Sequence, residues 1–217
     1  MIIEWFGQSC LKIQTKPTSN GEVVVVFDPY DSAKIGLKLP KLSGDILAIT
    51  HDHHDHNYAQ GVSGNPFTIS GAGEYEVKGV FIYGIPSFHD DKQGAERGPN
   101  TIYLMESEGL TVAHLGDFGQ ASLTTEQMSY LEGVDILILP VGGVYTIGAK
   151  VAAELVSEIE PRIVIPIHYK LPGLKVDLEA VEKFVKEVGL KPQLEEKLKV
   201  VKKDLPVEET KLIVLGC

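Results

Sequence analysis

Cysteine and positive charge are both scarce in this chain. Its two cysteines, Cys10 and Cys217, are too few for a disulfide framework, so we expect two free thiols. Lysine and arginine total 20 residues against 30 of aspartate and glutamate, which gives a formal net charge of −10. A binding face for DNA or RNA usually requires an excess of basic residues. The balance therefore disfavours nucleic acid and favours a small-molecule substrate.

Sequence signals of membrane, multidomain and cofactor-dependent proteins are also missing. Residues 1–5 contain no basic region followed by an apolar segment, so we expect no signal peptide, no membrane contact and a cytoplasmic location. No Pro/Ser-rich linker or fixed-period repeat divides the 217 residues, and we predict one domain over residues 1–217. The sequence leaves open whether the chain forms a homo-oligomer. No Gly-rich phosphate loop, dinucleotide fingerprint or Gly-x-Ser-x-Gly elbow suggests a nucleotide cofactor or a serine mechanism.

Histidine, by contrast, is concentrated. All seven histidines fall in four short segments, and four of them occupy one hexad, His51-Asp52-His53-His54-Asp55-His56, after an apolar run. Residues two apart on an extended chain point the same way. His51, His53 and Asp55 can therefore converge at a strand end, while His56 supplies a second direction. We expect His54 to be the histidine of the hexad that does not bind a metal.

The hexad has the chemistry of an open metal site. Imidazole and carboxylate ligands suit zinc, manganese or iron, and the lack of a nearby thiolate disfavours a closed structural zinc site. One metal rarely takes more than three or four protein ligands, and the hexad alone offers five donors. We therefore predict a centre with two metals, taken as two zinc ions per chain with manganese or iron as alternatives.

A second pattern recurs along the chain, in which apolar, β-branched runs end in residues that can bind a metal or move a proton. The residues that follow these runs are Asp28, His89, His114, Asp117 and His168. One polar residue at a strand end is ordinary. Ligands at the same end of several strands form one pocket, so the recurrence predicts a shared site.

In these motifs the chain resembles the metallo-β-lactamase superfamily. The hexad fits its His-x-His-x-Asp-His motif, and the later matches are Ser87-Phe88-His89, Gly116-Asp117 and Ile167-His168-Tyr169. Pro140-Val141-Gly142-Gly143, with Thr146 and Gly148, is similar to the branch that includes ascorbate-6-phosphate lactonase and N-acyl-phosphatidylethanolamine phospholipase D. The resemblance implies an α/β fold of four layers, an αββα sandwich.

The resemblance also implies which residues hold the metals. His51, His53 and His89 would hold one metal, Asp55, His56 and His168 the other, and Asp117 would bridge them. Catalytic roles fall to Asp55 and to His114, which either lies behind the ligands or faces the substrate. Asp28 either supports the hexad by a hydrogen bond or belongs to an Asp-Pro turn.

Three positions depart from the superfamily pattern. Gln8 stands where relatives often have histidine, Phe118 where many have threonine, and Asp90-Asp91 where small hydroxyl residues are common. These changes spare the metal ligands but remove the basis for a substrate assignment. Candidates for substrate contact are Arg97, Tyr145, Tyr169 and Lys170.

Hydrophobic periodicity predicts a strand-rich first half and alternating strands and helices in the second. Expected strands are 2–6, 10–15, 22–28, 45–50, 66–70, 75–85, 100–106, 110–114, 134–140, 162–167, 197–203 and 211–215. Expected helices are 57–62, 124–132, 148–159 and 177–188, the last with Asp177 as its N-cap.

A centre with two metals and a bridging carboxylate predicts hydrolysis. Two cations lower the pKa of a shared water toward about 7 and polarise a carbonyl or phosphoryl oxygen. Our first hypothesis is a metal-dependent hydrolase of a small ester, lactone or phosphodiester. The alternatives are a nuclease, which needs a basic groove that the sequence does not display, and a metal-binding protein without turnover.

Overall fold

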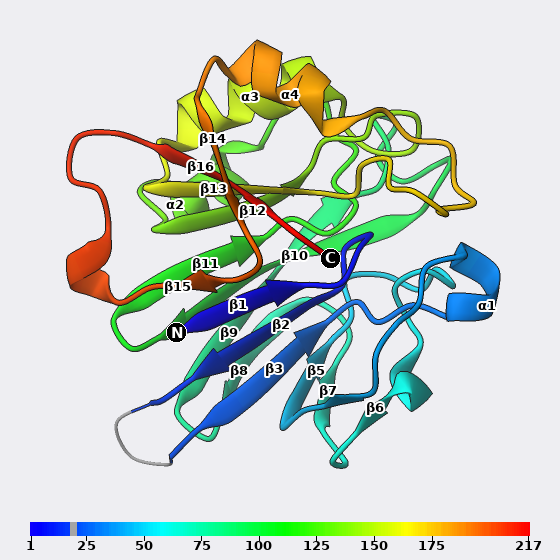
Figure 1. Cartoon of the computed structure of the whole chain (residues 1–217), viewed down its shortest axis with the longest axis vertical. Helices are drawn as coiled ribbons and strands as arrows, with labels where there is room; N and C mark the ends of the chain where they lie inside the picture. Colours follow the sequence, from blue (N-terminus) through cyan, green and yellow to red (C-terminus); the bar gives the residue numbers. More distant parts are fainter. Residues whose placement is uncertain (18–20) are drawn as a thin grey trace.

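The computed structural model describes residues 1–17 and 21–217. Its strands form two large sheets that face each other, with helices on the outside (Figure 1). Apolar side chains from both sheets form one buried core, which includes Ile13 and Phe27 from one sheet and Tyr103 and Ile138 from the other. The predicted α/β sandwich is confirmed.

The six-stranded sheet comes mainly from the first third of the chain. Its order is β15-β1-β2-β3-β5-β7. The strands are β1 (Ile2–Trp5), β2 (Leu11–Thr15), β3 (Val23–Phe27), β5 (Ile46–Ala48), β7 (Phe67–Ile69) and β15 (Leu198–Lys199). Because β3, β5 and β7 run parallel, their carboxyl ends meet at one edge of the sandwich.

The eight-stranded sheet has the order β14-β16-β13-β12-β11-β10-β9-β8. The strands are β8 (Gly73–Val77), β9 (Val80–Phe88), β10 (Pro99–Ser107), β11 (Leu110–His114), β12 (Ile136–Pro140), β13 (Ile163–Ile167), β14 (Pro192–Glu195) and β16 (Lys211–Leu215). β12 and β13 are buried at every residue because both of their faces are covered, and this explains their continuous apolar sequences.

Helices cover the outer face of the eight-stranded sheet. They are α2 (Thr125–Leu131), α3 (Ala149–Ile159) and α4 (Val181–Val188), and α3 and α4 lie together above the sheet in Figure 1. Gln127 of α2 donates a hydrogen bond to the carbonyl of Pro86 in β9, 2.8 Å away. This contact places α2 beside β9, near the β8 edge of the sheet.

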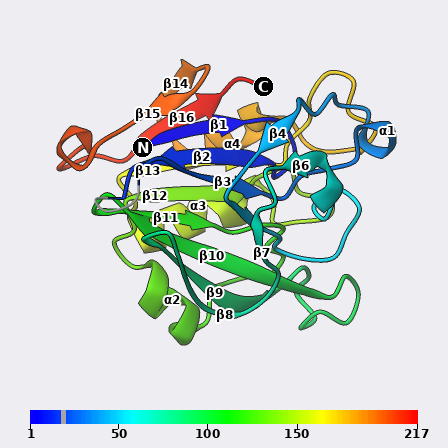
Figure 2. The same ribbon diagram turned by 90° about the horizontal axis from the view of Figure 1, so that it is seen from below.

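The six-stranded sheet has a thinner outer layer. It consists of α1 (Ser32–Ile35) and a small sheet of β4 (Leu42–Ser43) with β6 (Val62–Ser63), which lie near one another in Figure 2. Ile35, Leu42 and Val62 from these elements bury a second apolar cluster against Val26 and Leu47. The four layers αββα are thereby complete.

Two predicted helices need correction. Residues 57–62 form only a 3₁₀ turn, Ala59–Gly61. The helix predicted from residue 177 begins at Val181 with Ala180 at its N-cap, because Leu178 is buried and Asp177 lines a cavity instead of capping the helix. Within the described ranges, no helix has both the length and the apolar character needed to cross a membrane.

Two predicted strands also differ. Segment 75–85 is a hairpin, because Lys78 and Gly79 adopt positive φ angles of 55° and 82° that turn the chain between β8 and β9. Segment 197–203 is a strand only at Leu198–Lys199 and is followed by a 3₁₀ turn, Lys202–Asp204. The remaining strands and helices differ from their predicted bounds by a few residues, and α1, β4, β6 and β14 were not predicted.

Candidate metal centre

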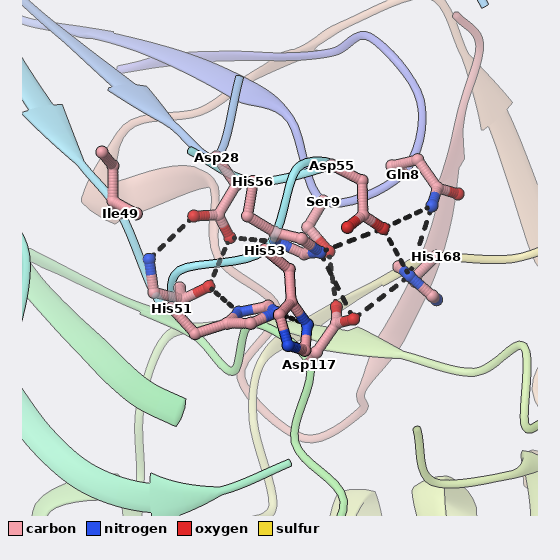
Figure 3. A network of polar contacts seen from close by, with 12 residues as sticks. Gln8, Ser9, Asp28, Ile49, His51, His53, Asp55, His56, Asp117 and His168 are labelled. Carbon is pink, nitrogen blue, oxygen red and sulfur yellow. Dashed lines mark hydrogen bonds and ion pairs between the residues drawn. The ribbon is translucent and has the colours of Figure 1, made fainter. Parts of the chain in front are cut away.

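Residues that can bind a metal lie just past the ends of five strands. Asp28 follows β3, the hexad follows β5, His89 follows β9, Asp117 follows β11 and His168 follows β13. Asp28 and His168 adopt left-handed φ angles of 43° and 51°. Such angles are uncommon in residues other than glycine, and the strain they cost is concentrated at functional sites. Figure 3 shows Asp28, four residues of the hexad, Asp117 and His168 close together.

The hexad is a turn rather than an extended segment. The backbone N–H groups of His56 and Asn57 both donate to the carbonyl of His53, at 2.9 and 3.0 Å. Asp55 therefore lies with His56 and not with His51 and His53, so the prediction that His51, His53 and Asp55 converge is wrong. Strand alternation no longer applies once the chain turns.

Two groups of ligand atoms form at this place, each within 4.8 Å. The first group is His51, His53 and His89, and the second is Asp55, His56, Asp117 and His168. These are the seven residues singled out from the sequence. His54 belongs to neither group, and its exposed side chain lies at the cavity over them.

The carboxylate of Asp117 lies between the two groups. Its Oδ2 atom is 3.3 Å from Nε2 of each of His56, His89 and His168, and His89 belongs to the first group. Two atoms bound to one tetrahedral zinc at about 2.0–2.1 Å are about 3.3 Å apart. The spacing therefore fits atoms that share a metal. Asp117 Oδ2 is therefore within reach of both groups.

The electrostatics of the second group fit a cation. Burial lowers the pKa of His56, but the carboxylates of Asp117, Asp55 and Asp28 outweigh it and raise this pKa well above its usual value. Nε2 of His56 is buried and makes no hydrogen bond within the described residues. A proton on His56 thus balances part of the charge that a divalent metal would balance more fully.

Two of the other imidazoles, His51 and His168, are held neutral. Burial, and then the nearby His56, lowers the pKa of His51 to about 2. Burial also lowers the pKa of His168. A neutral ring has a free nitrogen lone pair, which is the form that binds a metal. These rings are therefore ready to bind near neutral pH.

Asp28 supports the hexad. It accepts hydrogen bonds from the backbone N–H and the hydroxyl of Thr50, at 2.8 and 2.7 Å, and its Oδ2 lies 3.1 Å from Nδ1 of His56. The Thr50 hydroxyl is in turn 3.0 Å from Nδ1 of His51. These contacts at Nδ1 turn Nε2 of His51 and His56 toward the centre. Asp28 thus supports the hexad through Thr50 and through an ion pair with His56, whose Nδ1 makes no hydrogen bond within the described residues.

Two further residues orient Asp117, and sequence reasoning missed both. The Ser9 hydroxyl donates to Oδ1 of Asp117 at 3.2 Å, and Oδ1 of Asn100 accepts the backbone N–H of Asp117 at 3.1 Å. They leave Oδ2 free to face the imidazoles. Ser9 adjoins Gln8, but a single hydroxyl residue carries no signal of such a contact.

His114 does not face a substrate. Its side chain is completely buried and stacked on Phe27, with 5.1 Å between ring centroids. Nδ1 accepts the backbone N–H of Gly116 at 2.9 Å, and Nε2 donates to the carbonyl of Ser9 at 3.0 Å. The substrate-facing alternative is therefore wrong. His114 lies behind the ligands and contacts the Ser9 backbone.

Gln8, one of the three departures from the superfamily pattern, contacts the second group. Its Nε2 donates to Oδ2 of Asp55 at 3.2 Å and is 3.4 Å from Nε2 of His168 (Figure 3). The side chain is fully buried, and its Oε1 has no hydrogen-bond partner in the described part of the chain. Gln8 therefore contacts both a carboxylate and an imidazole of the second group.

A cavity of about 580 Å³ opens over the two groups. Its lining includes five residues of the two groups, His53, Asp55, His89, Asp117 and His168, together with Arg97 and Tyr145. Two sequence candidates for substrate contact fall outside it. Tyr169 is buried against Trp5, at 4.9 Å between ring centroids, and Lys170 is exposed but does not line the cavity.

Comparison with known proteins agrees with this geometry. A family described as the β-lactamase superfamily domain matches residues 2–168. A solved structure from Thermotoga maritima, described within the metallo-β-lactamase superfamily, is 31% identical, with a TM-score of 0.78 over 99% of each chain. This chain belongs to the metallo-β-lactamase superfamily.

Two curated relatives are similar over most of their length, and both are named UPF0173 metal-dependent hydrolases. The protein from Lysinibacillus sphaericus is 32% identical, over 82% of this chain and 89% of the relative. The protein from Pyrococcus abyssi is 31% identical, over 83% of this chain and 89% of the relative. These names agree with the metal-dependent hydrolase predicted from the hexad.

Proposed function

We propose that this superfamily member is a metal-dependent hydrolase that uses two zinc ions to cleave a small ester, lactone or phosphodiester. The observation that carries the proposal is the position of Asp117, whose Oδ2 lies 3.3 Å from imidazole nitrogens of both ligand groups. A carboxylate oxygen within reach of both groups could serve as a ligand of two metals at once. Manganese or iron suits the same donors.

The ligand assignment follows the two groups. His51, His53 and His89 would hold one ion, Asp55, His56 and His168 the other, and Asp117 both. When bound, two such ions supply a water acidified to a pKa of about 7 and positive charge for the oxygen of the scissile group.

The chain's own residues would carry out the remaining tasks. Asp55 lines the cavity, and its Oδ2 accepts a hydrogen bond from Gln8, so it is held in place and able to take a proton from the attacking water. Gln8 donates one N–H to this carboxylate and keeps it turned toward His168. Asp28 and Thr50 fix the rings of His56 and His51.

The size and charge of the cavity support a small substrate. About 580 Å³ is in the usual range for pockets that bind small molecules. Its lining contains two permanent cations, Arg97 and Lys175, together with Asp177. A nuclease needs a basic groove that follows a phosphate backbone, and neither this lining nor the net charge of −10 supplies one.

The test is a substrate panel of γ-lactones, aryl esters and bis-p-nitrophenyl phosphate. The protein is assayed after chelation, after reloading with zinc and after reloading with manganese. We expect turnover of at least one class, lost on chelation and restored by metal. If fully reloaded protein cleaves none of them, the alternative of a metal-binding protein without turnover is favoured.

A further inference from the structure

We propose that Arg97 binds a compact oxyanion of the substrate, a carboxylate or phosphate group separate from the bond that is cleaved. This inference rests on the proposed function, because it assigns the substrate class of the same cavity. Arg97 lines that cavity together with His53, His89 and Asp117. A substrate would then reach from the metal groups to the guanidinium.

The loop that carries Arg97 is well ordered by one buried carboxylate. The loop joins β9 to β10, and Asp90 accepts four backbone N–H groups within it. Oδ1 accepts from Lys92 and Gly94, both at 2.9 Å, and Oδ2 accepts from Glu96 at 2.9 Å and from Arg97 at 2.7 Å. The backbone of Arg97 is therefore fixed directly by Asp90.

The loop is also tied to the first ligand group. The loop closes through the N–H of His89, which donates to the carbonyl of Gly98 at 3.1 Å. The backbone around Arg97 is consequently tied to His89 and Asp90.

The guanidinium of Arg97 contacts an aromatic ring but has no carboxylate within hydrogen-bond distance. Its guanidinium carbon lies 5.8 Å from the centre of the Tyr145 ring, within the range of a cation–π contact. The nearest carboxylate, Glu96, is 3.9 Å from Nη1, too far for a hydrogen bond. Among the described residues, the guanidinium forms no hydrogen bond, so its donor fork is available to a ligand.

The other charged residues of the lining favour Arg97 as the anion contact. The ammonium group of Lys175 donates a hydrogen bond to the carbonyl of Ala33 at 2.9 Å. Asp177 also lines the cavity and repels anions at its own position. Asp55 and Asp117 face the metal groups. A planar guanidinium with free donors matches the two oxygens of a carboxylate or phosphate better than an ammonium does.

The experiment compares ligands that share one metal-binding group and differ in their tails. Acetohydroxamate has no anionic tail, succinate monohydroxamate carries a carboxylate, and phosphonoacetohydroxamate carries a phosphonate. Affinities for the zinc-loaded protein are measured by calorimetry, which needs no turnover. We expect one anionic tail to tighten binding about tenfold over acetohydroxamate, as a charge-assisted hydrogen bond would. The preferred tail distinguishes a carboxylate from a phosphate substrate.

Variants assign the gain to Arg97. In Arg97→Gln the gain should disappear, while acetohydroxamate binds as in the wild type. Arg97→Lys should keep only part of the gain, because the charge remains without the fork. Lys170→Gln is the matched control, since it removes one exposed positive charge two residues after His168 but outside the cavity lining, and it should retain the full gain.

Three results would overturn the proposal, each in a distinguishable way. If the wild type binds all three hydroxamates equally, the cavity has no oxyanion site although the metal centre stands. If Arg97→Gln weakens acetohydroxamate as much as the anionic ligands, Arg97 acts on the metal groups or the fold. If zinc-loaded wild type binds none of them, the proposed metal function fails and this inference fails with it.

Discussion

At the scale of residues, the site depends on which nitrogen of each imidazole is free. Thr50 and Asp28 contact Nδ1 of His51 and His56, and this leaves Nε2 of both rings directed inward. The histidines and carboxylates could be found from the sequence because their side chains are rare and closely spaced. The contacts of Thr50, Ser9 and Asn100 could not, because hydroxyl and amide residues occur everywhere and meet the ligands only after folding.

His168 and His54 should respond oppositely to replacement. We expect His168→Ala to lose the second metal while the protein stays folded, because the ring closes the group around Asp117. His54→Ala should keep full metal content, because its exposed side chain belongs to neither group. Zinc analysis measures the metal content of both variants, and circular dichroism shows whether they are folded. Unfolding of His168→Ala, or loss of a metal from His54→Ala, would contradict the ligand assignment.

His114 should affect turnover without binding a metal. It donates to the Ser9 carbonyl, and the Ser9 hydroxyl contacts Asp117, so we expect His114→Ala to keep both metals and to lower turnover about 10–100-fold. Phe27→Leu is the control, because it removes the stacking partner of His114 but none of its hydrogen bonds. Equal losses in both variants would attribute the effect to packing alone.

At the scale of elements, the strands of the core were the most predictable part. β12 and β13 are apolar at nearly every position because both faces are buried, and their predicted bounds agree within two residues. The short edge elements were not predictable. α1 has four residues and β4 and β6 have two each, too few for a periodic pattern to appear. The turn within the hexad was missed because the alternation of histidine and aspartate was interpreted as an extended segment, although Asp52 and Asp55 are also residues that favour turns.

The loop between β12 and α3 must approach His168 closely. A Cβ added to Gly142 would lie 2.1 Å from the carbonyl oxygen of His168. We therefore expect Gly142→Ala to destabilise the fold by about 1–3 kcal/mol and to weaken metal binding in the second group. Gly148→Ala is the control, since its added Cβ meets only Gly143 at 3.9 Å. Zinc affinity and urea denaturation measure both effects, and identical behaviour of the two variants would contradict the prediction.

At the scale of the whole molecule, both sheets contribute residues to the site. The hexad and Asp28 follow strands of the six-stranded sheet, whereas His89, Asp117 and His168 follow strands of the eight-stranded sheet. Sequence order could predict this only through the resemblance, because pairing between distant strands leaves no local signal. A single domain over residues 1–217 and a cytoplasmic location stay predictions.

Asp45 links the two sheets far from the site. Its carboxylate accepts the N–H of Val24 in β3 at 2.9 Å and pairs with Lys78 in the β8–β9 turn. The Lys78 hydrogen bond is the main cause that lowers the pKa of Asp45, against the effect of burial. A carboxyl with a lowered pKa stabilises the fold above its unfolded pKa of about 3.9, and this contribution is lost as the pH falls through the folded pKa.

Asp45→Asn should therefore destabilise the protein only where the carboxyl is ionised. At pH 7 and low salt we expect a loss of up to about 1 kcal/mol in the free energy of unfolding, which shrinks as the pH falls below about 4. Urea denaturation at several pH values measures the difference, and Lys78→Met should reproduce its direction. A difference that stays constant down to about pH 3 would show that the ion pair is not the cause.

The most direct test of the central claim is the zinc content of the protein after reconstitution and removal of excess metal. A centre in which Asp117 is shared predicts two zinc ions per chain in the wild type and loss of both in Asp117→Ala, because one carboxylate serves both groups. Elemental analysis of the folded proteins gives the count. One ion or none in the reconstituted wild type, or two ions retained in Asp117→Ala, would contradict the account.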